Sequence, residues 1–199
     1  MFETATNDDV LQLYRSDTHW LSTAWDGGYT RADAAYNITV PTGWDRTDLD
    51  SYVTQRLDRA EFEQPGPTLL TGVDQSHARG ARLGGTVAVA TVGLSNPSSL
   101  AIHPDDDSSA NPNQSADVGT VNLFVGTDRS LDDGGLATLL AAAVEAKTAT
   151  LVSMTGFTGT TTDAVVVGSN PTGDRVPFAG SATAVGTEAR ACVRDAIQA

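Results

Sequence analysis

The chain has 199 residues, with 25 Asp or Glu against 12 Lys or Arg and a formal net charge of −13. Phosphate binding requires clustered Lys and Arg, so this balance argues against nucleic acid as a partner. Cys192 is the only cysteine, which excludes a disulfide framework and a cysteine-based zinc site. The length is sufficient for one domain with a substantial core.

The acids are scattered and mostly Asp, and Lys147 is the only lysine, so every other basic side chain is Arg. This pattern indicates a protein adapted to a high-salt cytoplasm, where dense carboxylates keep a protein hydrated. The acidic N-terminus has no apolar core of a signal peptide, and no apolar run looks long enough to span a membrane. We therefore expect a soluble cytoplasmic protein with no membrane partner. The oligomeric state stays open, and a homo-oligomer is compatible with the sequence.

The first half alternates strand and helix patterns. Residues 1–18 resemble a polar lead-in with a short helix or strand around 10–14. After it, apolar runs and turn residues predict strands and one helix: strands at 19–25, 34–40, 68–73 and 85–94, and a helix from Asp48 or Thr47 to about Phe62. Asn37, inside the second strand, is either a turn-facing amide or a site residue.

The second half contains the most regular pattern. Residues 95–118 form a long Pro- and Asp-containing segment, which is either a functional cover or disordered. Further elements follow: a strand at 119–128, a long helix capped by Asp132 or Asp133, a turn at 156–162, a strand at 163–168 and a C-terminal helix from Gly186. This order predicts an α/β or α+β fold, a single layered domain over 1–199 with a mixed β-sheet packed by two to three main helices.

Lys147 is unusually placed in the long helix. At about 100° per residue, one stripe collects these apolar side chains: Leu136, Leu140, Ala143, Val144 and Leu151. Lys147 lies near the middle of the stripe, and Glu145 points to nearly the opposite side. A cation there is costly unless it is paired and hydrogen-bonded. Either its stem packs while its head reaches water, or it pairs with a carboxylate inside a cleft; the scarcity of lysine favours the second interpretation.

Five motifs stand in order in the second half: GTVN at 119–122, VEAKTATL at 144–151, TGTTTDAVVV at 158–167, FAG at 178–180 and a final helix led by Gly186. This series resembles the adenosylcobinamide amidohydrolases, enzymes of corrinoid salvage, which have GTIN-, TEAKTAAL-, TGTGTD- and YAG-type segments in the same order. The first half, including N-x-x-V at 37–40 and TVGLSNPSS around Asn96, is similar more loosely. Thr161 stands where the family tends to have Gly, which removes a residue tolerant of positive φ.

The resemblance implies hydrolysis of the amide that joins the corrin side chain to aminopropanol, giving adenosylcobyric acid and 1-amino-2-propanol. Such a reaction needs an activated water or nucleophile, donors for the oxyanion and a proton for the leaving amine. Asp163 or Glu145 are candidates for the base, and Lys147 for stabilising the oxyanion or protonating the amine. Candidate substrate contacts are Asn37, Asn96, Gly119, Thr120, Asn122, Thr158, Gly159, Thr160 and Thr162.

Each candidate also has a structural interpretation, because Thr-rich turns and strand-end asparagines often satisfy local backbone groups. Glu145 and Lys147 are two residues apart on one helix and cannot face each other. We therefore expect Asp163 to be the partner of Lys147, brought over by the turn after the helix.

The histidines show no metal-ligand spacing, so no protein metal site or cofactor is expected. The cobalt belongs to the corrinoid substrate, which is the expected small-molecule partner. Two alternatives to the enzyme stay open: a non-catalytic corrinoid-binding or sensing module, and an unrelated acidic structural domain.

Overall fold

The computed structural model describes residues 1–41, 43–95, 97–98 and 119–199. The strands are β1 Glu3–Asn7, β2 Val10–Ser22, β3 Gly28–Thr39, β4 Thr68–Thr71, β5 Arg79–Leu83, β6 Thr86–Val92, β7 Pro97–Ser98, β8 Val121–Thr127, β9 Gly159–Thr160 and β10 Ala164–Ser169. The helices are α1 Leu49–Arg59, α2 Asp133–Thr155, α3 Ala184–Gln198 and the short 3-10 helix η1 Gln75–His77. The expected mixed α/β architecture is confirmed.

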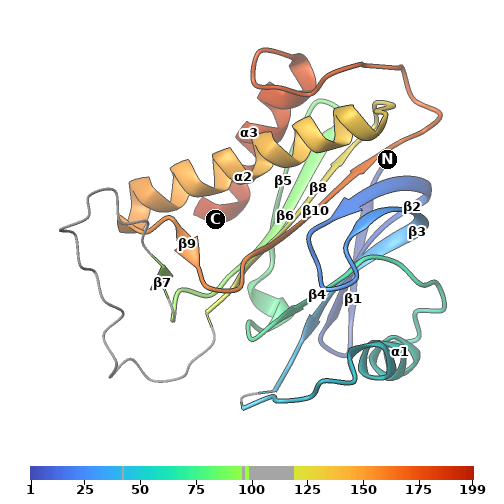
Figure 1. Cartoon of the computed structure of the whole chain (residues 1–199), viewed down its shortest axis with the longest axis vertical. Helices are drawn as coiled ribbons and strands as arrows, with labels where there is room; N and C mark the ends of the chain where they lie inside the picture. The colour runs from blue at the N-terminus through green and yellow to red at the C-terminus, as the bar shows by residue number, and fades with distance from the viewer. Residues whose placement is uncertain (42, 96, 99–118) are drawn as a thin grey trace.

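One large mixed sheet has the strand order β4-β3-β2-β10-β8-β6-β5, with β1 added on β2. Strands β3 and β4 are parallel, as are β8 and β10, whereas the other pairs are antiparallel. Helices α2 and α3 lie together over β10, β8, β6 and β5 (Figure 1). Helix α1 packs against side chains of β2, β3 and β4. The short pair β7–β9 sits apart, beside the C-terminal end of α2 (Figure 1).

The sheet is strongly curved, so that β2 and β3 face β6 and β8, and an irregularity in β2 contributes to this curvature. The register of β2 with β3 shifts between Tyr14 and Thr18, and Asp17 at this irregularity has a φ of 49°. Such bulges increase local twist. As a result, side chains from β2 and β3 pack against β6, β8 and β10 in one internal cluster that includes Phe2, Trp20 and Phe124. A second cluster lies under α2 and α3, and a third lies under α1.

Helix α2 begins and ends with standard caps. Asp132 accepts a hydrogen bond from the Gly135 N–H at 2.9 Å, and Gly156 ends the helix at a φ of 79°. By length and composition alone α2 is long and apolar enough to cross a membrane, contrary to the sequence expectation, and 50% of its most apolar stretch is buried. A helix that is apolar on most sides is typical of a core helix, and α2 packs as one.

Two edge strands, β1 and β5, were not predicted from the sequence. The expected polar lead-in over residues 1–18 contains strand β1 and the first part of β2, and the strand alternative around 10–14 is confirmed. The two-residue turn between these strands places Asp8 and Asp9 at φ of 45° and 57°. These values suit a type I′ turn, although Asn-Gly or Asp-Gly is its usual sequence. Strand β5 was also missed because its burial is slight, and the Gly84-Gly85 turn that joins it to β6 is its only clear signal. Most of the segment 95–118, expected to be either a functional cover or disordered, lies outside the described residues.

Candidate active site

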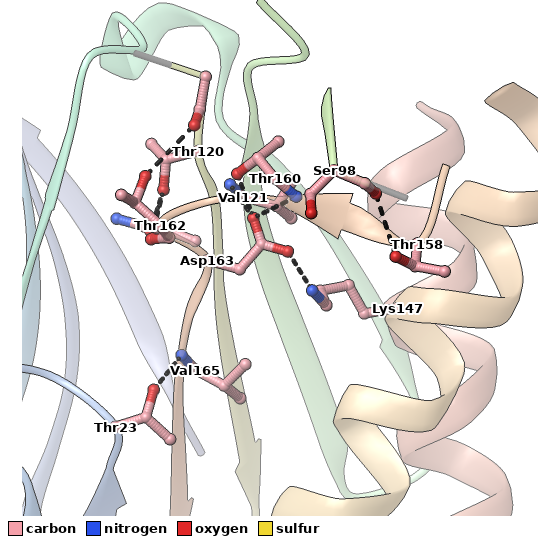
Figure 2. A network of polar contacts seen from close by, with 12 residues as sticks. Thr23, Ser98, Thr120, Val121, Lys147, Thr158, Thr160, Thr162, Asp163 and Val165 are labelled. Atoms are coloured by element: carbon pink, nitrogen blue, oxygen red, sulfur yellow. Dashed lines mark hydrogen bonds and ion pairs between the residues drawn. The ribbon is translucent and has the colours of Figure 1, made fainter. Parts of the chain in front are cut away.

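The expected contact between Lys147 and Asp163 is present. The Lys147 ammonium donates to Asp163 Oδ2 across a short ion pair between α2 and the residue that precedes β10 (Figure 2). The two side chains are 7% and 12% exposed, so the pair is largely withdrawn from water but reaches the surface. The buried stripe of α2 therefore contains a paired cation, and the interpretation of a lysine head reaching free into water is wrong.

Asp163 is held by further donors on its other oxygen. The backbone N–H groups of Val121 and Thr160 donate to Asp163 Oδ1 at 3.0 and 3.1 Å, and the Thr160 hydroxyl donates to the same oxygen (Figure 2). Hydrogen bonds between an ammonium and a carboxylate are among the strong ones in proteins. The result is a fixed carboxylate that orients the Lys147 ammonium.

Gly159 allows the turn to pass close to this pair. A Cβ on Gly159 would lie 3.1 Å from Lys147 Nζ and would overlap the Asp163 carboxylate. The neighbouring Thr158 anchors the turn, because its N–H and its hydroxyl both donate to the Ser98 carbonyl, at 3.1 and 3.0 Å. The glycine is thus required here for space, which the Gly/Thr-rich sequence alone does not reveal.

Glu145 is not part of this cluster. Its carboxylate accepts a 2.6 Å hydrogen bond from Arg190 on α3, and its side chain is 62% exposed. The helical geometry predicted this opposite direction, yet Glu145 was also a candidate base. The structure places it on the wrong side of α2 for that role, whereas Lys147 and Asp163 lie together.

The remaining candidates divide into two groups. Thr158, Gly159 and Thr160 border the ion pair in the turn, and exposed Thr162 follows them, with its hydroxyl 3.3 Å from the carbonyl oxygen of buried Gly119. A second group is fully buried, at 0 to 2% exposure: Asn37, Thr120 and Asn122. Asn96 lies outside the described residues.

The site lies at the amino ends of two parallel strands, because Asp163 precedes β10 and Thr120 precedes β8. Ligands in open parallel sheets usually bind at the carboxyl ends, so general fold rules do not point here. Open grooves of about 320 to 350 Å³ also occur elsewhere on the described surface, for example beside Trp25 and Pro67. None of these grooves is lined by Lys147 or Asp163, and the ion pair is the chemically distinctive feature of the described residues.

No cluster of three His, Cys, Asp or Glu side chains suitable for a metal ion occurs within residues 1–41, 43–95, 97–98 and 119–199. His19 instead lies 3.4 Å from Asp133 at the start of α2. Cys192 lies on the buried face of α3, where burial raises the pKa of its thiol.

Comparison with known proteins gives a consistent result. The family model for adenosylcobinamide amidohydrolase matches residues 2–199. A curated adenosylcobinamide amidohydrolase of Halobacterium salinarum is 51% identical over 201 residues, covering 100% of this chain and 87% of the relative. One from Methanosarcina mazei is 26% identical, covering 96% of this chain and 94% of the relative.

Among solved structures, a protein of Pyrococcus horikoshii matches with a TM-score of 0.51 and 12% identity, covering 98% of this chain and 78% of that chain. At this identity the match concerns the fold alone. The family model and the Halobacterium relative, by contrast, both extend over essentially the whole sequence. The chain therefore belongs to the adenosylcobinamide amidohydrolase family.

Proposed function

We propose that this protein hydrolyses the amide of adenosylcobinamide that joins the corrin side chain to aminopropanol, in cobinamide salvage. The products are adenosylcobyric acid and 1-amino-2-propanol. The observation that carries the proposal is the Lys147–Asp163 ion pair, which holds a fixed and largely desolvated ammonium beside the turn at 158–162 (Figure 2). The names of the two curated relatives support the same substrate.

Lys147 is the proposed catalytic residue. Amide hydrolysis builds negative charge on the carbonyl oxygen and requires a proton on the departing nitrogen. An ammonium has three donors, and one of them is directed at Asp163. The other two can stabilise the oxyanion or protonate the aminopropanol nitrogen, and partial removal from water strengthens both interactions.

Asp163 is the proposed positioning residue for that ammonium. Its two oxygens accept from three different residues, Val121, Thr160 and Lys147. Both oxygens are thus engaged within the protein, so we assign Asp163 to positioning rather than to the role of general base. Glu145 is not retained as the base either, because Arg190 holds it on the other side of α2.

Two threonine hydroxyls of the turn already use their protons in hydrogen bonds within the protein. Thr158 and Thr160 donate their protons within the protein, to Ser98 and to Asp163. A hydroxyl that has donated its proton offers only lone pairs. We therefore expect these groups to accept from N–H or O–H groups of the substrate, such as corrin carboxamides, rather than to bind its carbonyl. No dedicated cofactor is needed for this chemistry, and the cobalt belongs to the substrate.

The test is incubation of the purified protein with adenosylcobinamide at high KCl, with mass-spectrometric detection of free aminopropanol and adenosylcobyric acid. The variant Lys147→Met should lose activity while keeping the apolar stem of the side chain. Arg194→Met is the matched control, because it removes one positive charge from an exposed position. Full activity of Lys147→Met would remove Lys147 from the mechanism, and substrate binding without products would favour the corrinoid-binding alternative.

A further inference from the structure

A directional chain of hydrogen bonds runs through the interior from the candidate site to the other half of the sheet. The Thr120 hydroxyl lies 3.0 Å from Asn122 Oδ1, and Asn122 Nδ2 donates to Asn37 Oδ1 at 2.8 Å. Asn37 Nδ2 lies 3.4 Å from Gln75 Oε1, and Gln75 Nε2 donates to the Thr39 hydroxyl at 3.0 Å. Asn122, Asn37 and Gln75 each donate onward, away from the site, so the bonds between these amides reinforce one another.

The two asparagines have no donor left for a ligand. Asn122 Nδ2 gives its second proton to the Leu70 carbonyl at 2.9 Å, and Asn37 Nδ2 gives one to the Thr91 hydroxyl at 3.0 Å. Asn37 is 1% exposed and Asn122 is 0% exposed. Side chains that are buried and fully satisfied in this way are suited to holding the structure rather than to binding a corrin amide.

This chain ends against the turn that carries Asp163. The Thr120 hydroxyl is also 3.0 Å from the Thr162 carbonyl oxygen (Figure 2). The next residue, Val121, donates its backbone N–H to Asp163. A single hydroxyl therefore contacts the buried amides and the turn at once, directly beside a backbone group that holds the catalytic ion pair.

We propose that Thr120, Asn122 and Asn37 are positioning residues for the Lys147–Asp163 pair and do not bind the substrate. They fix the start of β8 against the turn, so that the Val121 N–H meets Asp163 and Asp163 orients the ammonium. The kinetic consequence rests on the proposed amide hydrolysis. Removing a residue that acts through the geometry of the reacting groups lowers kcat. Removing a residue that binds the ground state and the transition state equally well raises KM instead.

The test variant is Thr120→Val, which keeps the shape of the side chain and removes its hydroxyl. Thr120→Ser restores a hydroxyl, and Thr18→Val is the matched control, because Thr18 is equally buried and its hydroxyl donates to the Arg15 carbonyl, in the bulge of β2. We expect kcat with adenosylcobinamide to fall about tenfold or more in Thr120→Val at unchanged KM. It should recover in Thr120→Ser and stay at the wild-type value in Thr18→Val.

Amide hydrogen exchange gives a readout that does not depend on turnover. Protection of the Val121 and Thr160 N–H groups should fall about tenfold in Thr120→Val relative to Thr18→Val. A raised KM at constant kcat, or unchanged protection of both amides, would overturn the positioning role. If the wild type gives no product, the proposed function fails, and the exchange data alone decide whether Thr120 positions the pair.

Discussion

Removing Asp163 from the buried ion pair should destabilise the fold more than removing Lys147. In Asp163→Asn, the Lys147 ammonium stays 7% exposed and loses the carboxylate that is its acceptor among the described residues. Breaking a buried pair by removing one partner typically costs about 3–5 kcal/mol. In Lys147→Met, the Asp163 carboxylate keeps the Val121 and Thr160 donors. Its cost should be smaller, about 1–3 kcal/mol, comparable to one lost charged hydrogen bond.

The double variant Lys147→Met/Asp163→Asn sharpens this comparison. It contains no uncompensated ammonium, so it should be more stable than Asp163→Asn alone, although it carries one more substitution. The assay is urea denaturation at constant high KCl, read as the midpoint at equal m values. If Lys147→Met costs as much as Asp163→Asn, or if the double variant is the least stable of the three, the assignment of a buried, donor-saturated carboxylate is wrong.

Three other predictions concern the turn, the thiol and a buried phenol. Gly159→Ala should reduce kcat about 100-fold, because its Cβ overlaps the ion pair and small displacements are costly. The control Gly134→Ala, whose Cβ meets nothing closer than 3.5 Å, should keep full activity. Cys192 should react with a thiol reagent only after unfolding, since burial raises the pKa of its thiol. Burial also raises the pKa of Tyr36 above the ordinary value of about 10. Stability, measured by urea midpoints, should therefore fall as pH rises through about 10, where only the unfolded chain ionises, and Tyr36→Phe should reduce that loss.

The helices and central strands could be predicted because their signals are local. The apolar runs of β6, β8 and β10 are bounded by turns, and α2 has a capping Asp and a terminal glycine. The edge strands β1 and β5 could not be predicted, because their side chains are mostly exposed and so lack the alternating apolar and polar pattern of a half-buried strand. Whether Asp8-Asp9 forms a tight turn depends on the strand pairing on both sides, which is a tertiary effect.

The candidate site could be predicted in part for a related reason. Helical periodicity placed Lys147 in the buried stripe and Glu145 opposite, and chain order brought the turn with Asp163 to the helix. The environment of Asn37 and Asn122 could not be inferred, because their partners come from strands 85 residues apart in sequence that meet only when the sheet bends. Residue type alone makes a buried asparagine and a ligand-binding asparagine look the same.

Stability gives little reason for a lysine at position 147. Replacing a buried ion pair by apolar side chains of similar volume is often neutral or stabilising, and the neighbouring stripe of α2 is already apolar. Apart from three histidines, every other basic residue in this chain is Arg, whose guanidinium does not release a proton in proteins. Lysine is the basic side chain that can hold a compact charge and also pass a proton to a leaving amine. The one lysine of the chain thus stands where the proposed amide hydrolysis needs both properties, oriented by a carboxylate that the folded turn holds in place.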